Sequence, residues 1–272
     1  MPTFDWTAQG GTAPAEYETF LVPAMFAPFA ETLVEQAGVS EGSHVLDVAC
    51  GTGAASRAAA RRAGPRGSVT GLDLGEPQLA IARAAPAEEG AAPITFKQSD
   101  AAALDAESDA FDVATCQQGL QFFPDRPAAL AEMRRALKPG GRLAVATWTA
   151  MESNPFGAVV EALQSHVSSD AASMLASPFA LTAEELGSVI AAAGFSDVQV
   201  RQEEQVCTFD ARPEEFGPRA IACGPLAASF AQTPAEAQRA VAEDVGERLR
   251  QHVDGEGRVR MPMVSNVALA AA

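Results

Sequence analysis

The stretch HVLDVACGTGAASRAAARRA, residues 44–63, decides how the chain folds. It begins with a short apolar run, residues 45–49, which is typical of a strand buried on both faces of a parallel sheet. Gly51 and Gly53 follow at once, and helix-forming sequence then continues from 54 to 63. Glycines at such a turn let the backbone approach a ligand, and the start of the helix offers unpaired N–H groups. The stretch therefore predicts a nucleotide-type binding turn between a strand and a helix.

The same alternation of strand and helix repeats through the next hundred residues. Further strands are predicted at 68–74, 94–100, 111–117 and 142–148, with helices at 77–85 and 126–137. Strands that alternate with helices indicate a doubly wound parallel sheet. The turn signal at 138–141, Lys-Pro-Gly-Gly, separates the second of these helices from the fifth strand.

The flanking sequence extends this pattern without a composition break. Residues 16–37 predict an amphipathic helix with breaks at Pro23 and Pro28. Later elements are predicted as helices at 155–168 and 182–195, a sixth strand at 197–209, two or three helices within 213–252 and a last strand at 258–270. Thr182 and Glu185 form an N-terminal capping pattern for the second of those helices.

The predicted fold class is therefore α/β. We expect a doubly wound, Rossmann-like, seven-stranded and mostly parallel sheet with helices on both faces, an N-terminal helical lid and a helical insertion before the last strand. One domain is predicted over residues 1–272, with the lid at 1–40, a cofactor-binding core at 41–150, and a sheet completion at 151–272 that carries a helical cap at about 213–252.

Composition and charge narrow the class of protein. The 272 residues are 47% hydrophobic and 20% charged, an ordinary globular composition, and the net charge is −16. A protein that binds the phosphate backbone of a nucleic acid needs a positively charged surface, so a nucleic-acid partner is disfavoured. No apolar run approaches the roughly 20 residues of a membrane span, and the first residues lack a secretory pattern, so a cytoplasmic protein without a membrane partner is expected. The four cysteines lie far apart and predict buried thiols; no metal site is expected.

Three cofactor classes use a glycine turn of this kind. A P-loop requires a lysine after the turn, but Gly53 is followed by alanines, which rules that class out. A dinucleotide fingerprint matches imperfectly, with Ser56 in place of its third glycine. The third class holds S-adenosylmethionine. Asp73, at the end of the second strand, can accept ribose hydroxyls in either of the last two classes. Asp100, after the third strand, suits an adenine amino group, which dinucleotide folds do not require.

Five segments stand in the order of the motifs of one family: VLDVACGTG (45–53), GLDL (71–74), SDA (99–101), FDVATCQQGLQFFPD (111–125) and LKPGGRLAV (137–145). In these segments the chain resembles class I S-adenosylmethionine-dependent methyltransferases. The branch it resembles includes ubiquinone/menaquinone C-methyltransferases and small-molecule tailoring methyltransferases. The resemblance is strong over residues 16–148 and extends beyond them only as the usual sixth and seventh strands.

The resemblance implies a set of cofactor-binding residues. They contact S-adenosylmethionine along its length and are Asp47, Ala49, Cys50, Gly51, Gly53, Asp73, Leu74, Asp100, Ala101 and Gln117. The glycine turn passes beneath the methionine and ribose moieties, and Asp47 lies near the ammonium group. Asp73 takes the ribose, and Leu74 lies beside the adenine. Asp100 and Ala101 contact the edge of the adenine, and Gln117 marks the methionine end.

One position departs from the family pattern, because relatives often carry glycine where this chain has Ala49. A methyl group is small, so cofactor binding is not put in doubt, but the turn must be shaped around it.

Candidates for catalysis and for the acceptor pocket are fewer. Tyr17, Gln121 and His166 are the catalytic candidates. Gln121 stands where relatives often carry a histidine; glutamine can orient an acceptor but does not act as a base at neutral pH. Phe26, Phe122 and Trp148 are candidates for an apolar acceptor pocket.

The predicted function is S-adenosylmethionine-dependent methyl transfer to O, N or C of a small cytosolic metabolite, as in specialised metabolism, with S-adenosylhomocysteine as product. Proximity and desolvation supply most of the catalysis. Two alternatives stay open: methylation of a quinone ring carbon, and a protein that binds S-adenosylmethionine but catalyses another reaction such as a cyclisation. A nicotinamide dehydrogenase is a more distant alternative. The sequence leaves the acceptor and the oligomeric state open.

Overall fold

The computed structural model describes residues 13–149, 151 and 154–272. Contacts group the chain into two compact units, each built from several segments. The first unit holds the described residues of Met1–Met25, Ala150–Ala180 and Glu204–Val264. The second holds Phe26–Thr149, Leu181–Glu203 and Ser265–Ala272. The predicted division into lid, core and cap stays a prediction.

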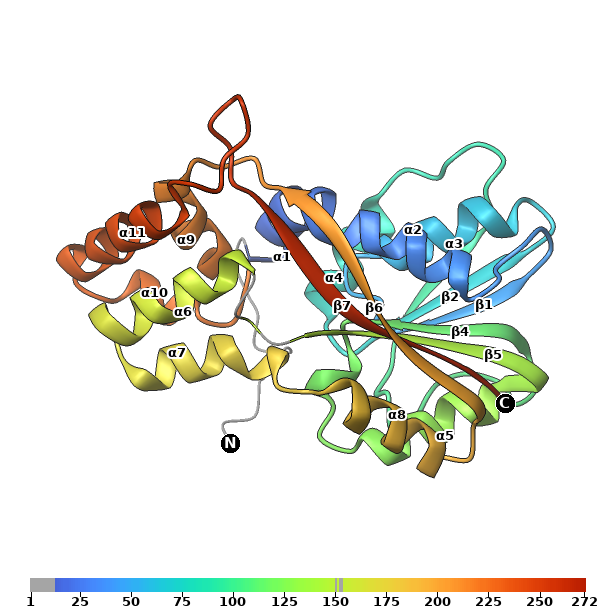
Figure 1. The fold of residues 1–272 in the computed structure, drawn as a ribbon. Helices are drawn as coiled ribbons and strands as arrows, with labels where there is room; N and C mark the ends of the chain where they lie inside the picture. The colour runs from blue at the N-terminus through green and yellow to red at the C-terminus, as the bar shows by residue number, and fades with distance from the viewer. Residues whose placement is uncertain (1–12, 150, 152–153) are drawn as a thin grey trace. The chain divides into compact units, whose positions relative to one another are not determined.

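A seven-stranded sheet organises the fold (Figure 1). Its strands, in spatial order, are β3 (Ile94–Gln98), β2 (Ser68–Asp73), β1 (His44–Val48), β4 (Phe111–Gln117), β5 (Leu137–Trp148), β7 (Arg260–Ala271) and β6 (Ser196–Thr208). The pairs β1–β2, β1–β4, β2–β3 and β4–β5 are parallel, and β5–β7 is antiparallel. The predicted fold class is confirmed.

Helices of the second unit cover both faces of the sheet. They are α2 (Ala27–Gln36), α3 (Ala54–Ala63), α4 (Glu76–Ala84), the 3₁₀ turn η3 (Leu120–Phe122), α5 (Arg126–Ala136) and α8 (Ala183–Ala192). On one face, α2 and α3 pack aliphatic side chains, mostly alanines in α3, against Val45, Val113 and Val267. On the other, α5 and α8 pack against Leu46 and Val145. Successive strand residues point to opposite faces, so one apolar run serves both layers.

The first unit is built mainly from helices. They are α1 (Ala13–Glu16), the π-helix η2 (Tyr17–Phe26), which ends one residue inside the second unit, α6 (Pro155–His166), α7 (Ser169–Ala176), η5 (Ser177–Phe179), α9 (Pro213–Ala222), α10 (Ala227–Ala231) and α11 (Ala235–Leu249). Phenylalanine rings form its core: Phe209 and Phe216 meet edge to face with centroids 5.0 Å apart. Arg219 lies 4.1 Å from the centroid of the Phe20 ring, a cation–π contact.

The helical segment near the N-terminus differs from the expectation. Helical backbone runs from Ala13 to Gln36 without the interruptions predicted at Pro23 and Pro28. Pro23 lies inside the π-helix, and Pro28 occupies the first turn of α2, where a missing N–H leaves no helical bond unmade. The prolines therefore accompany a change of helix type rather than a break. The capping box of Thr182 and Glu185 on α8 is confirmed.

Candidate cofactor site

The turn after β1 adopts a left-handed backbone at three residues. The φ angles are 57° at Ala49, 55° at Gly51 and 92° at Gly53. A Cβ placed on Gly51 would meet nothing within 4 Å, whereas one on Gly53 would lie 3.0 Å from the Phe96 ring. Gly51 therefore faces open space that a bound group can fill, and Gly53 is required by close packing as well as by its backbone.

Ala49, the departure from the family pattern, is accommodated by a second glycine. A Cβ on Gly119 would lie 2.6 Å from the Cβ of Ala49, which is closer than real side chains approach. The methyl group of Ala49 thus occupies space that Gly119 leaves free. The turn is shaped around the alanine, as the sequence predicts, and Gly119 is the residue that permits it.

Asp73 joins the end of β2 to the glycine turn. One carboxylate oxygen accepts the N–H of Gly51 and the other accepts the N–H of Gly75, each at 2.7 Å. Burial raises the pKa of Asp73, and these two amide bonds oppose the rise. The next residue, Leu74, is 45% exposed, which is unusual for a large apolar side chain in this protein. A carboxylate and an apolar surface therefore stand side by side at this strand end.

Asp47 is buried beneath the same turn. Its carboxylate accepts the hydroxyl of Ser56 at 2.6 Å and that of Thr115 at 2.9 Å. Only 1% of the residue is exposed. Burial raises the pKa of Asp47 to about 6, the two hydroxyl bonds oppose the rise, and the nearby charge of Asp73 adds to it. Two carboxylates with raised pKa values thus lie at neighbouring strand ends, where a bound cation would be favoured.

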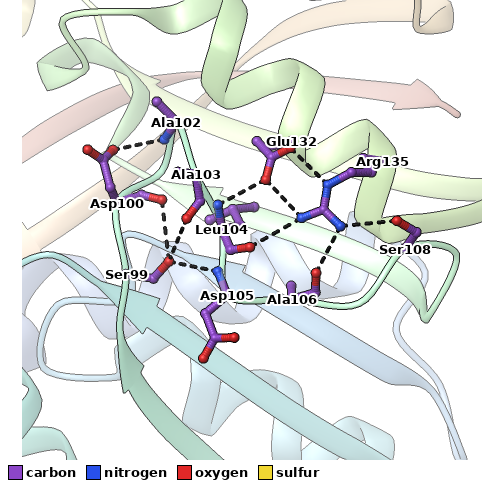
Figure 2. A network of polar contacts seen from close by, with 10 residues as sticks. All are labelled: Ser99, Asp100, Ala102, Ala103, Leu104, Asp105, Ala106, Ser108, Glu132 and Arg135. Carbon is purple, nitrogen blue, oxygen red and sulfur yellow. Dashed lines mark hydrogen bonds and ion pairs between the residues drawn. The ribbon is translucent and has the colours of Figure 1, made fainter.

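The loop after β3 carries Asp100 and is fixed to helix α5 (Figure 2). Asp100 accepts the N–H of Ala102 at 2.9 Å, within a tight turn. Glu132 accepts the N–H of Leu104 at 2.9 Å, and Arg135 donates to the carbonyl oxygens of Leu104 and Ala106 at 3.2 and 2.9 Å. Glu132 and Arg135 also bond each other at 2.8 Å. This pair on α5 therefore holds the loop that presents Asp100 and Ala101.

The residues after β4 use their amides to bind other parts of the second unit. The side-chain amide of Gln117 donates to the backbone carbonyl of Phe26 at 2.8 Å. The side-chain Oε1 of Gln121 accepts the backbone N–H of Trp148 at 3.0 Å. The Trp148 ring contacts Phe26 with centroids 5.9 Å apart and Phe29 at 5.4 Å. Two of the three predicted pocket aromatics are thus brought together.

The third pocket aromatic, Phe122, lies half-buried on the 3₁₀ turn η3. Cys50, in the glycine turn, is buried, and burial raises the pKa of its thiol.

Tyr17 and His166 belong to the first unit. His166, at the end of α6, has its Nε2 3.1 Å from a carboxylate oxygen of Asp244 on α11, and Arg248 donates to the same carboxylate. This is a contact between two helices of the first unit. The catalytic roles of Tyr17 and His166 stay predictions.

Several residues that shape the site escape sequence reasoning. Ser56 and Thr115 hold Asp47, Gly119 accommodates Ala49, and the pair on α5 fixes the loop after β3. Thr115 carries a usable signal, because it is a polar residue inside the apolar run of β4 and stands opposite Asp47 in the parallel register. The pair on α5 carries none, since apart from the Ser108 hydroxyl its partners in the loop are backbone groups.

Comparison with known proteins identifies the family. Residues 27–203 match the model of the ubiE/COQ5 methyltransferase family. The chain belongs to the ubiE/COQ5 methyltransferase family. Its resemblance to class I S-adenosylmethionine-dependent methyltransferases is thereby confirmed, and the predictions of a methyltransferase and of S-adenosylmethionine as cofactor hold at the level of the family.

Individual relatives match the ubiE/COQ5 part of the chain. The nocamycin O-methyltransferase of Saccharothrix syringae is 37% identical over 118 residues, 43% of this chain and 42% of that protein. The demethylmenaquinone methyltransferase of Lactococcus lactis is 42% identical over 110 residues, 40% of this chain and 44% of that protein. The chain therefore matches less than half the length of these relatives.

A solved structure shares the fold. The phosphoethanolamine N-methyltransferase 2 of Haemonchus contortus, in complex with phosphomonomethylethanolamine and S-adenosylhomocysteine, superposes with a TM-score of 0.60 at 18% identity, covering 96% of this chain and 57% of that one. At this identity the likeness concerns the fold alone.

The residues present fit the cofactor of the ubiE/COQ5 family. Gly51 faces open space, two buried carboxylates stand at the adjoining strand ends, and the buried hydroxyl of Thr52 has no partner among the described residues. S-adenosylmethionine carries a sulfonium and an ammonium, which suit this negative edge. In the part of the chain that the structure describes, no helix is long and apolar enough to cross a bilayer, and no three His, Cys, Asp or Glu side chains cluster to hold a metal ion.

The loop after β3 offers a first mutational test. Arg135→Ala is expected to speed hydrogen exchange of the Leu104 amide and to weaken S-adenosylhomocysteine binding roughly threefold to tenfold. The loop loses the Arg135 bonds to the carbonyls of Leu104 and Ala106, and Glu132, which accepts the Leu104 N–H, loses the partner that orients it. Arg134→Ala, at the exposed neighbouring position, removes the same charge and should change neither. Equal effects of the two variants would contradict the positioning role. Hydrogen-exchange mass spectrometry and calorimetry provide the readouts.

Proposed function

We propose that this chain transfers the methyl group of S-adenosylmethionine to an oxygen, nitrogen or carbon atom of a small molecule. Family membership and the fitted cofactor site support the reaction class. The matched relatives include an O-methyltransferase and a demethylmenaquinone methyltransferase, so they do not select one of these three atoms.

One observation carries the proposal: two buried carboxylates flank an open glycine cradle. Asp73 ties Gly51 to the end of β2, and Asp47 lies buried at the end of β1. Each carboxylate has a raised pKa, so each gains from a cation placed nearby. A dinucleotide would bring a negatively charged pyrophosphate to the same glycine turn. The charge of the site therefore favours a sulfonium cofactor over NAD.

The bound cofactor supplies an already activated methyl group, so the protein's contribution is placement and exclusion of water. Asp47 and Asp73 fix the turn beneath the cofactor. The aromatic side chains of Phe26 and Trp148, together with Phe122, offer an apolar surface for an acceptor. Gln121 supplies an amide and no titratable group, so an acceptor in this unit loses its proton by its own acidity.

Direct binding and turnover test the proposal. Calorimetric titration with S-adenosylhomocysteine and with NAD should show binding of the first only. Incubation with methyl-labelled S-adenosylmethionine and a panel of phenols, enols, amines and quinols should then transfer label. Tight NAD binding would overturn the cofactor assignment. Binding of S-adenosylhomocysteine without label transfer to any acceptor would favour a non-methylating reaction such as a cyclisation.

The pH dependence of turnover tests the mechanism separately. Across a series of phenols of different acidity, we expect the apparent pKa in kcat/KM to follow the pKa of each phenol, because the acceptor ionises by itself. Rates rise with pH up to that pKa and then level off. A pKa that stays constant across the series would instead reveal an enzyme base.

Methylation of a quinone-type ring carbon is the second candidate. It is favoured by the 42% identity over 110 residues to the demethylmenaquinone methyltransferase. Against it, Gln121 replaces the histidine often present in relatives, so the proton lost from the ring carbon must leave by another route. Label on carbon, distinguished from label on oxygen by its resistance to ether cleavage with hydriodic acid, separates the two.

A further inference from the structure

A hollow of about 490 Å³ lies in the second unit between α3, α4 and β3, the edge strand of the sheet. Its lining includes Arg57, Ala60, Ala82, Ala85, Ile94 and Phe96. Both helices contribute buried alanines to it: Ala60 is 1% exposed and Ala82 is 3% exposed. An alanine methyl group fills less space than the larger apolar side chains of a packed core, so the two helices leave the hollow open between them.

The lining of the hollow is mostly apolar, and its charged side chains already have partners. Ten of the thirteen lining residues are alanine, proline, isoleucine or phenylalanine. Of the three charged ones, Arg83 pairs with Glu76 at 2.5 Å, Glu88 pairs with Arg61 at 2.6 Å, and the third donates to a backbone carbonyl. A charged ligand would lose hydration in the hollow without gaining an unpaired countercharge, whereas an uncharged ring would gain apolar burial.

Two residues of this lining also support the glycine turn. A Cβ placed on Gly53 would lie 3.0 Å from the Phe96 ring, and one placed on Gly71 would lie 2.6 Å from the same ring. Phe96 therefore fills the space that both glycines leave. Arg57 donates to the backbone carbonyl of Thr52 at 2.7 Å. Phe96 is half-buried and lines the hollow, so a ligand there would touch a side chain that also packs on the turn.

We propose that the hollow is a second small-molecule site, which takes an uncharged, mainly apolar ring and whose occupancy tightens cofactor binding. Its volume lies within the roughly 300–1,000 Å³ of small-molecule pockets. The residues that the resemblance assigns to the cofactor are all described by the structure, and none of them lines the hollow. The site is therefore additional to the proposed methyl transfer and holds for any acceptor.

The coupling between the two sites follows from the position of Phe96. A ring in the hollow confines the Phe96 side chain to the place where it packs on Gly53, whose backbone is left-handed with φ of 92°. The ligand thereby favours the form of the turn that holds the cofactor, because it gains the Phe96 contact in that form. Such coupling is reciprocal, so the cofactor must raise the affinity of the hollow for its ligand by the same factor.

The first arm of the test measures the binding of indole, an uncharged two-ring probe, by ligand-observed NMR without cofactor. The wild-type protein should bind indole with a Kd of about 1 mM or below. Indole-3-acetate and tryptamine, which carry a carboxylate and an ammonium, should bind at least about fivefold more weakly. Equal binding of the three probes would overturn the assignment of an uncharged ligand.

Variants that fill the hollow locate the probe. Ala85→Leu, at the half-buried end of α4, should weaken indole binding at least about fivefold because the larger side chain occupies the hollow. Ala84→Leu, at the exposed neighbouring position outside the lining, is the matched control and should bind indole like the wild type. Ala91→Leu fills the hollow from the loop before β3 and should act like Ala85→Leu. Indole binding that neither filling variant weakens would overturn the site.

The second arm measures the coupling by calorimetry. Saturating indole should raise the affinity of the wild-type protein for S-adenosylhomocysteine about threefold to tenfold, and saturating S-adenosylhomocysteine should raise indole affinity equally. Phe96→Leu keeps an apolar wall but withdraws the ring from Gly53, so indole should bind without changing S-adenosylhomocysteine affinity. Ile94→Leu, on the same strand and in the same lining, should keep the coupling. S-adenosylhomocysteine affinity that indole leaves unchanged or lowers in the wild type would overturn the coupling.

The two arms distinguish the hollow from the proposed function. Indole binding that the filling variants weaken and Ala84→Leu does not would support the hollow even in a protein that transfers no methyl group. Methyl transfer by a protein that binds no indole would count against the hollow alone.

Discussion

Gly51→Val is expected to weaken S-adenosylhomocysteine binding at least about 100-fold while the protein stays folded. Gly51 has a φ of 55°, and a Cβ placed on it meets nothing within 4 Å, so the free protein has room for the side chain. The same room is where the cofactor is proposed to pass. The valine side chain therefore clashes with the bound ligand and not with other residues of the protein. Calorimetric titration measures the loss of S-adenosylhomocysteine affinity.

The matched control is Gly90→Val, because Gly90 also has a left-handed backbone, with φ of 77°, and open space at its Cβ. It lies in an exposed loop between α4 and β3, away from the carboxyl ends of β1 and β2. Both variants should lose about 1–3 kcal/mol of unfolding free energy from backbone strain. Only Gly51→Val should lose the ligand. If both variants bind S-adenosylhomocysteine like the wild type, the glycine turn is not the cofactor cradle.

The parallel core of the fold is predictable from local sequence. Buried parallel strands are apolar on both faces, so the runs at 45–49 and 111–117 stand out even in an alanine-rich chain, and glycines or prolines mark their ends. The predicted start of the fifth strand is less accurate. β5 begins at Leu137 rather than at 142, because Leu137 pairs with Phe111 before a register shift. A pairing across such a shift depends on the partner strand and has no local signature.

The candidate site is predictable where one residue acts alone and unpredictable where two distant residues act together. Asp47, Asp73 and the glycines follow strands, and the motifs locate them. The amide bonds after β4 join residues far apart in sequence: 91 positions separate Gln117 from Phe26, and 147 separate Gln118 from Ser265. Glutamine is an ordinary surface residue in most contexts. Only the sheet order, which brings β7 beside β5, reveals that Gln118 is buried against Ser265.

Asp47→Asn is expected to stabilise the cofactor-free protein and to weaken cofactor binding. Burial raises the pKa of Asp47 to about 6 from 3.8, so the native state binds more protons than the unfolded state between these values. Stability therefore falls as the pH rises from about 4 to 6, and the charged form costs about 3 kcal/mol above that range. Asparagine avoids this cost. Urea unfolding should show the variant more stable at pH 8, with the difference nearly gone at pH 3.5.

Although Asp47→Asn should raise stability, it should lower the affinity for S-adenosylhomocysteine. S-adenosylhomocysteine keeps the ammonium that the resemblance places near Asp47, so removal of the buried charge should weaken its binding at least about tenfold at pH 8. For the wild type, affinity should also fall as the pH drops through 6, because Asp47 must ionise before it attracts the cation. If the Asp47→Asn variant is more stable and binds S-adenosylhomocysteine with unchanged affinity, the Asp47 charge does not contribute to ligand binding. That result would contradict the assignment of Asp47 to the cofactor ammonium.

Asp112→Asn is the control that separates this behaviour from that of any strand aspartate. Asp112 lies on β4 and accepts hydrogen bonds from Lys138 and from the N–H of His44 at the opposite end of β1, and these partners lower the pKa of its carboxyl. Its ionised form is favoured in the folded state, so Asp112→Asn should lower stability at pH 8, with a loss that disappears as the pH falls below about 4. Cofactor affinity should not change. The two aspartates then give opposite signs in stability, and only Asp47 gives a change in binding, which is the pattern expected when a buried charge is kept for a ligand rather than for the fold.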